Sequence, residues 1–166
     1  MPEAVARTFW DRMRGAALLD VPTYEEVEHD PTATGQAATV VAMAAAAQAI
    51  GASAAGPGRL LAAALGALLA WLAWAAVTYV IGDHLFGGTA TWGELLRTLG
   101  FAQSPNVLAV LALLPLVGWL VEAVLFFWVV TAGIIAIRQA LDIGTGKALL
   151  TALLGAMVFG AFSVLT

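Results

Sequence analysis

The sequence predicts an all-α integral membrane protein, a five-span helical bundle with short N-terminal interfacial helices. Two properties of the composition lead to this fold class: 61% of the 166 residues are hydrophobic and only 11% are charged, whereas a soluble domain carries about 25% charged residues. The third observation is a series of apolar runs close to the roughly 20 residues that a transmembrane helix requires. Because the chain has no cysteine, a disulfide framework and a thiolate metal site are excluded.

Five apolar segments are expected to cross the bilayer. The first is rich in Ala and Gly, and small residues let helices approach closely in lipid. The stretch from Pro105 to Ile137 holds 33 residues with Glu122 as its single charge. As one helix it would measure about 50 Å, although the hydrocarbon core is only about 30 Å thick, so the Pro and Gly of "PLVG" (115–118) predict a reversal. The expected spans are residues 35–55, 60–82, 105–117, 119–139 and 147–166.

The basic residues support this count and set its orientation, because cytoplasmic flanks carry an excess of Lys and Arg. With five spans and the N-terminus inside, six basic residues lie on inner flanks and one, Arg59, lies on an outer flank. With four spans the split is four to three. The six inner residues are Arg7, Arg12, Arg14, Arg97, Arg138 and Lys147.

The five-span arrangement divides the chain into two parts. We expect residues 1–34 to form a cytoplasmic N-terminal segment and residues 35–166 to form the membrane domain, with the carboxyl terminus outside. Span 105–117 is short for a full crossing. We therefore expect a tilt or kink in that span, or a shallow position for the tip of the hairpin.

The N-terminal segment is predicted to contain two short helices. Residues 4–19 are amphipathic, with Phe9 and Trp10 on the apolar face, which is typical of a helix lying on a membrane surface. A frayed tail is the alternative. Thr23 and Glu26 have the spacing of a capping box, which predicts the start of the second helix.

An acidic run lies in the second predicted helix, residues 22–31. The simplest interpretation is a solvated helix face, and the alternative is a docking patch for a basic surface of a partner. A metal site that includes His29 is not favoured, because the spacing of ligands matches no known loop. The acidic residues of the run are Glu25, Glu26, Glu28 and Asp30.

Two inner loops are expected to lie in the membrane interface, where aromatic and basic side chains are favoured. In residues 87–105, Thr91 and Glu94 repeat the capping-box spacing and open a short helix with one apolar side. In residues 138–150, "GTGK" lacks the earlier Gly and the following Ser or Thr of a phosphate-binding loop, so no nucleotide site is expected. The expected interfacial anchors are Phe9, Trp10, Trp92, Arg97, Arg138 and Lys147.

The isolated charge of Glu122 allows two interpretations. In the five-span arrangement it lies about one turn past the outer hairpin, where a carboxylate reaches water or caps a helix. Alternatively, it is a buried polar group that serves a partner contact or an ion path, the usual suspicion for an acid within a membrane. Gln48 in the first span is the second candidate polar residue within the membrane. No Ser–His–acid set or HExxH pattern is present, so neither an enzyme nor a cofactor or metal site is expected.

Two long stretches share the motif order of a known family. They are "GGTATWGELLRTLGFAQSPNVLAVLALLPLVGWL" and "FFWVVTAGIIAIRQALDIGTGKALL", in which Pro105 opens a span and Arg138 lies in a charged turn. Together they cover most of residues 36–166 and resemble the Yip-type membrane domain, named for Ypt/Rab-interacting proteins. The head "FWDRMRGAALLDVPTYEEVEHDP" resembles the bacterial branch of this family.

The resemblance implies five spans and a cytoplasmic N-terminus, in a bacterial cytoplasmic (inner) membrane. It does not transfer the prenylated GTPase partners of the eukaryotic members. The long cytoplasmic head of those members is largely missing here, and a bacterium would lack Rab proteins.

Several classes of function remain open. A non-enzymatic scaffold or adaptor that organises membrane proteins or lipid is favoured by the small-residue first span and the lack of a chemical site. The alternative is an accessory subunit of a larger, energy-transducing membrane complex. A transporter or channel is less favoured because the chain shows no internal repeat, and a lipid-modifying enzyme is least favoured. The expected partners are the lipid bilayer and other membrane proteins or a second copy, with no nucleic acid and no nucleotide.

Overall fold

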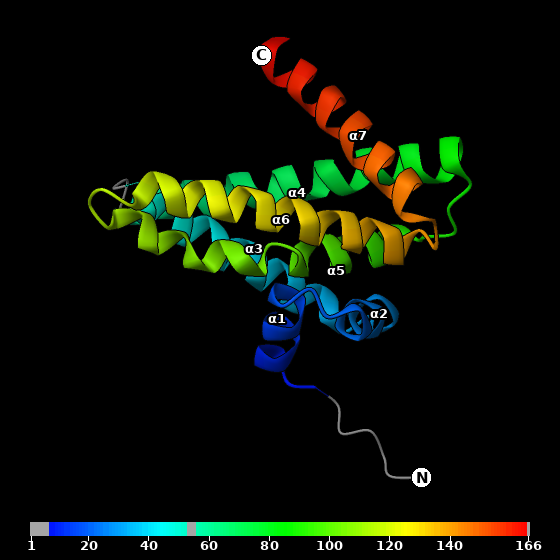
Figure 1. The fold of residues 1–166 in the computed structure, drawn as a ribbon, viewed down its shortest axis with the longest axis horizontal. Coiled ribbons are helices and arrows are strands. Elements are labelled where there is room, and N and C mark those ends of the chain that lie inside the picture. Colours follow the sequence, from blue (N-terminus) through cyan, green and yellow to red (C-terminus); the bar gives the residue numbers. More distant parts are fainter. Residues whose placement is uncertain (1–6, 53–55, 166) are drawn as a thin grey trace.

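The computed structural model describes the backbone of residues 7–52 and 56–165, and the side chains as far as Val158. Every regular element in these ranges is a helix (Figure 1). The first residues of the predicted helix 4–19 and the last of the predicted span 35–55 fall outside the described residues. The elements are α1 (Phe9–Ala17), α2 (Val21–His29), α3 (Ala33–Gly51), α4 (Pro57–Phe86), α5 (Trp92–Phe101), the 3₁₀ helix η1 (Ser104–Leu113), α6 (Gly118–Ala140) and α7 (Thr145–Leu165).

α1 begins at a capping box that the sequence analysis did not identify. The Thr8 hydroxyl accepts a hydrogen bond from the Asp11 amide at 3.3 Å, and the Asp11 carboxylate accepts one from the Thr8 amide at 3.1 Å. These reciprocal bonds satisfy two amide groups that have no partner within the helix. The short helix therefore starts at a position fixed by its own sequence.

The second predicted helix is present as α2, but the capping box expected at Thr23 and Glu26 is wrong. Asp20 precedes the helix and Pro22 lies in its first turn, where the fixed φ of proline and its missing N–H are tolerated. Thr23 is therefore inside the helix. It is fully buried, and its hydroxyl donates to the Asp20 carboxylate at 2.6 Å.

The capping box expected at Thr91 is confirmed, and it opens α5. The Glu94 carboxylate accepts from the Thr91 amide at 2.7 Å, while the Thr91 hydroxyl accepts from the Glu94 amide. The expected position of this helix at the membrane surface stays a prediction, but residues 95–101 are all buried within the protein. They pack against α2, α3, α4 and α6. α5 is a core helix with only its first turn near the surface.

Three helices among the described residues are long and apolar enough to cross a bilayer: α3, α4 and α6. α4 has 30 residues, which corresponds to about 45 Å and exceeds a hydrocarbon core of about 30 Å. The described apolar part of α7, Thr145–Val158, is shorter than a full span. Two of the five expected spans, residues 105–117 and 147–166, are therefore not among these three helices.

The third expected span is a 3₁₀ helix rather than an α-helix. A 3₁₀ helix rises about 2.0 Å per residue, so the 10 residues of η1 extend over about 20 Å, compared with about 15 Å in an α-helix. The chain turns at residues 115–117, and α6 packs back along η1 (Figure 1). Gly118 allows this return, because a Cβ there would collide with the main-chain carbonyl of Ala112.

Small residues bring α3 into close contact with its neighbours. A Cβ on Gly100 of α5 would lie 2.7 Å from the Cβ of Ala37, and Ala37 is fully buried. At the other end of α3, a Cβ on Gly51 would collide with the carbonyl of Ala109 in η1. The Ala- and Gly-rich sequence of α3 thus allows close packing against α5 and η1, as small residues do between membrane helices. α7 instead diverges from the other helices after its first turns (Figure 1).

Candidate functional site

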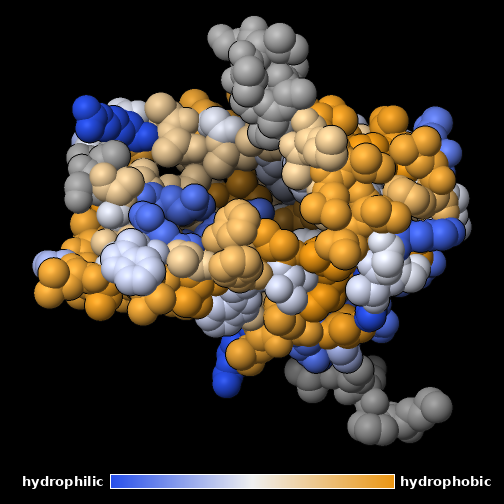
Figure 2. Space-filling model, turned by 45° about the horizontal axis from the view of Figure 1, so that its top comes forward, coloured by the Kyte–Doolittle hydropathy of each residue, from blue (hydrophilic) through white to orange (hydrophobic). Residues whose placement is uncertain are grey.

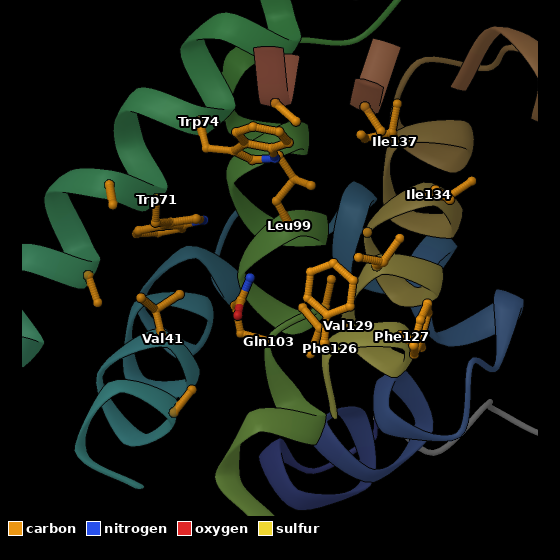
Figure 3. A pocket seen from close by; sticks show the side chains of 18 of the residues that line it. Val41, Trp71, Trp74, Leu99, Gln103, Phe126, Phe127, Val129, Ile134 and Ile137 are labelled. Carbon is orange, nitrogen blue, oxygen red and sulfur yellow. The ribbon is translucent and has the colours of Figure 1, made fainter. Parts of the chain in front are cut away.

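A large cavity lies where α7 diverges from α4 and α6. Its volume is about 600 Å³, and it is lined by residues of α3, α4, α5, α6 and α7 and by Ala102 and Gln103, which follow α5. On one side, Trp71 and Trp74 of α4 face the space. Phe126 and Ile137 of α6 face it from the opposite side (Figure 3). The lining is almost entirely apolar, as in sites that bind hydrophobic groups.

Two amides interrupt this apolar lining. Gln48 of α3 and Gln103, which follows α5, both line the cavity, and Figure 3 shows the Gln103 amide pointing into it. The Gln103 side-chain oxygen also accepts a hydrogen bond from the Asn106 side-chain amide at 2.9 Å. Gln103 and Asn106 are therefore linked to each other, and Gln48 is a separate polar group in the lining.

A second cavity of about 470 Å³ adjoins the first and contains Glu122. It is also lined by Gln48 and Asn106. The structure thus brings together Glu122 and Gln48, the two polar residues that the sequence analysis placed within the membrane. Glu122 is exposed in the described structure and lies four residues after the start of α6 at Gly118. Sequence reasoning missed Asn106, although it follows Pro105 at the start of a predicted span.

The N-terminal helices form a second candidate region, organised around Arg12. This arginine is 6% exposed, and its guanidinium lies 2.9 Å from a Glu26 carboxylate oxygen and 2.7 Å from one of Asp30. It also donates to the Gln36 side chain at 3.2 Å, so one residue joins α1, α2 and α3. The sequence contained a signal: Arg12 is three residues after Phe9, on the row that turns toward the core.

The acidic run is not a free surface patch. Glu26 and Asp30 are paired with Arg12, and a hydrogen bond from Thr32 together with Arg12 lowers the pKa of Asp30. Glu28 is only 6% exposed. Glu25 is exposed, and its carboxylate accepts a hydrogen bond from the Gln139 side chain of α6 at 3.0 Å. Most of the run is therefore used within the molecule.

Glu28 occupies an unfavourable position for a carboxylate. Burial raises its pKa to about 7, and the negative charges of Asp142, Glu94 and Glu25 add to the rise, while His29 opposes it. Arg97 of α5 contacts Glu28, but its guanidinium donates to the main-chain carbonyl of Glu28 at 3.0 Å and not to the side-chain carboxylate. The Glu28 carboxyl therefore changes its charge near neutral pH.

The six expected interfacial anchors have different environments. Trp10 is 60% exposed and Trp92 is 43% exposed, which fits contact with a membrane surface. Phe9 packs partly against the core, and Arg97 is buried, where it holds α2 rather than lipid. Arg138 bonds to the side chain of the adjacent Gln139 at 2.9 Å, and Lys147 donates to the carbonyl of Phe86 at the end of α4 at 3.1 Å.

α1 is also tied to the membrane helices. The Trp128 indole of α6 donates to the Ala17 carbonyl at 2.7 Å, and the buried Tyr24 hydroxyl donates to the Ala16 carbonyl at 3.0 Å. Within the described ranges, no group of three or more His, Asp or Glu residues is placed to hold a metal ion. The arrangement offers polar and apolar contact surfaces.

Comparison with known proteins gives one result. The Yip1 domain matches residues 17–166, which is most of the chain and includes α2 to α7. No curated protein and no solved structure matches it. Together with the apolar helices, this match makes the protein a multi-pass membrane protein. The chain belongs to the Yip1-domain family.

Proposed function

We propose that this protein is a non-enzymatic scaffold or adaptor of the bacterial cytoplasmic membrane. It presents a fixed platform, made of α1 and α2, to other membrane proteins. The observation that carries the proposal is the attachment of this platform at several points. Arg12 joins it to α3, Arg97 holds α2 from α5, and Trp128 holds α1 from α6. Segments that serve only as tethers do not require such bonds.

The platform has an outer surface suited to contact. Trp10 of α1 and Leu18, which follows it, are 60% and 64% exposed, and exposed aromatic and aliphatic side chains favour a membrane surface or a protein partner. Glu25 supplies the exposed carboxylate of the acidic run. A basic segment of the partner would dock at this side chain.

Five spans with a cytoplasmic platform are part of this proposal. The ends of the helices gather into two groups, which supports it. At one end, Thr89 before α5 bonds to the Leu141 carbonyl and the Asp142 side chain after α6. At the other end, Gly51 meets Ala109 of η1. Alternating spans require these two groups, with the loops before α5 and after α6 on one side.

Affinity purification from native membranes in mild detergent, followed by mass spectrometry, tests the scaffold. The wild-type chain should recover a stoichiometric partner. Arg12→Ala should lose it because the platform detaches, whereas Arg14→Ala, an exposed residue of the same helix, should retain it. Recovery of an energy-transducing complex would make the chain an accessory subunit. Recovery of the monomeric chain alone would refute the scaffold.

A further inference from the structure

The two adjoining cavities are open toward the side where lipid surrounds the helices. Several large apolar side chains that line the first cavity are also exposed: Phe126, Phe127, Leu149 and Leu153. The space-filling view shows a hollow on this face of the molecule (Figure 2). Apolar surface of this kind is unfavourable in water. In a bilayer, hydrocarbon chains are available to cover and fill it.

The cavities extend along a large part of α6. Their lining on this helix begins at residue 122 and ends at residue 137, a difference of 15 residues, which corresponds to about 22 Å. Four residues line both cavities: Gln48, Phe126, Val129 and Val130. One leaflet contributes about half of a hydrocarbon core of about 30 Å, so a whole acyl chain fits along the helix.

The polar lining is concentrated toward one end. Glu122 is the single charged residue among the side chains that line the two cavities. It lies four residues from the start of α6, or about 6 Å along the helix axis, which is the depth of the headgroup boundary if α6 starts at the membrane surface. A carboxylate at this place attracts a cation, and the nearby amides of Gln48 and Asn106 donate hydrogen bonds to neutral oxygens.

We infer that the two cavities form one lateral slot for a phospholipid with a primary ammonium headgroup. The acyl chain lies along α6 between the indoles of α4 and the ring of Phe126. The ammonium group pairs with the Glu122 carboxylate, and ester oxygens accept from Gln48 and Asn106. This inference rests on the proposed function only for the placement of the helices in a bilayer. The slot holds its lipid whether or not a protein partner binds the platform.

Native mass spectrometry of the full chain in mild detergent tests the slot. The probes are phosphatidylethanolamine, phosphatidylcholine and phosphatidylglycerol with identical acyl chains. The wild type should retain one phosphatidylethanolamine, with a preference of about tenfold over phosphatidylglycerol, equivalent to about 1.4 kcal/mol. Glu122→Gln should retain lipid but lose this preference.

A larger side chain that fills the slot should displace the lipid. Gly133 lines the cavity, and a Cβ there would meet no atom within 4 Å, so Gly133→Leu extends into the slot without a collision at its Cβ. Gly66→Leu is the matched control: a Cβ at Gly66 also meets nothing, and Gly66 is an exposed residue of α4 outside the lining. Lipid retention should fall at least about tenfold in Gly133→Leu and stay unchanged in Gly66→Leu.

A second variant makes the test independent of whether Gly133→Leu folds. Because the chain has no cysteine, a cysteine introduced at residue 133 is its single thiol. Gly133→Cys can be alkylated with a bulky maleimide after purification, which fills the slot of a protein that is already folded. Alkylation should release the lipid, and alkylation of Gly66→Cys should not.

Three results would overturn the inference. The first is equal lipid retention in the blocked and control variants, and the second is equal retention of all three lipids by the wild type. The third is a dimer that only the Gly133 variants dissociate, since this would assign the slot to a second copy of the chain. Absence of a protein partner from the wild-type purification, with lipid still bound, would refute the scaffold and leave the slot in place.

Discussion

Arg97 of α5 and Glu28 of α2 meet where the two helices pack, and the charged guanidinium of Arg97 binds the main-chain carbonyl of Glu28. The Arg97 guanidinium donates to the main-chain oxygens of Glu28 and Val27 at 3.0 and 2.9 Å. It thereby holds the end of a short helix, where carbonyl groups lack partners within the helix. The Glu28 carboxyl is buried at the same interface. Because burial raises the pKa of this carboxyl, folding is coupled to the protonation of Glu28.

This coupling predicts that stability depends on pH. The pKa of Glu28 is about 7 in the folded protein, compared with an ordinary value of 4.5, so the folded state binds the proton more tightly. The free energy of unfolding should fall as pH rises from about 4.5 to about 7, by at most about 3 kcal/mol. Thermal unfolding in detergent at pH 5 and pH 8 measures this fall.

Glu28→Gln should remove most of the pH dependence, because an amide at this position carries no charge to bury. The variant should match the wild type near pH 4.5 and be more stable at pH 8. Glu25→Gln, at an exposed position of the same helix, is the control and should keep most of the wild-type slope, because burial of Glu28 and not the charge of Glu25 is the main cause of the raised pKa. Equal slopes in all three proteins would show that Glu28 is not the responsible group.

Arg12→Ala should destabilise the N-terminal platform by about 1–3 kcal/mol. Removal of one partner of a buried ion pair costs about 3–5 kcal/mol. Solvent reduces this cost here, because the Glu26 and Asp30 side chains retain 29% and 26% exposure. Hydrogen exchange should show faster exchange in α1 and α2 and little change in α4. Arg14→Ala is the control, and equal exchange in both variants would refute the central role of Arg12.

Gly100→Ala should destabilise the membrane domain by about 1–3 kcal/mol, the usual cost of overpacking. The new Cβ would lie 2.7 Å from the Ala37 Cβ and 3.2 Å from its backbone, so α3 and α5 must separate. Gly35→Ala on α3 is the matched control, since a Cβ there meets no atom within 4 Å. Unfolding temperatures in detergent measure the difference, and equal temperatures would contradict the close contact.

Local signals in the sequence predicted the parts of the fold that depend on local chemistry. The capping box at Thr91 was found because its two residues, Thr91 and Glu94, are only three positions apart in the sequence. The box at Thr23 failed because Pro22 and Asp20 offer a better helix start one turn earlier. The burial of α5 was missed for a different reason. An arginine in a short amphipathic segment is typical of a helix at the surface. The carbonyl groups that bind Arg97 lie 69 and 70 residues away in the chain, so no local pattern indicates its burial.

The candidate site was predicted in part for the same reason. Glu122 and Gln48 were found because polar residues within apolar runs are conspicuous. The cavity that they share lies between α3, η1 and α6, and the adjoining one opens where α7 diverges from α4 and α6. No local pattern encodes either arrangement of helices. The acidic run was interpreted as exposed because Arg12 was counted only as a charge of the inner flank, although it follows Phe9 on the helix row that turns toward the core. Its pairing with Glu26 and Asp30 depends on the packing of α1 against α2.

The final prediction concerns the number of spans, and the absence of cysteine makes single-cysteine labelling direct. Leu116 is 93% exposed in the turn before α6, and Gly144 precedes α7 in a loop where a Cβ meets nothing within 4 Å. With five spans and the N-terminus inside, an impermeant maleimide should label Leu116→Cys in intact cells. It should label Gly144→Cys only after permeabilisation, because α6 separates the two positions. Arg14→Cys, in the platform, controls for the cytoplasmic side. Labelling of both loops from the same side would mean that α6 does not cross, and labelling of Arg14→Cys in intact cells would reverse the orientation.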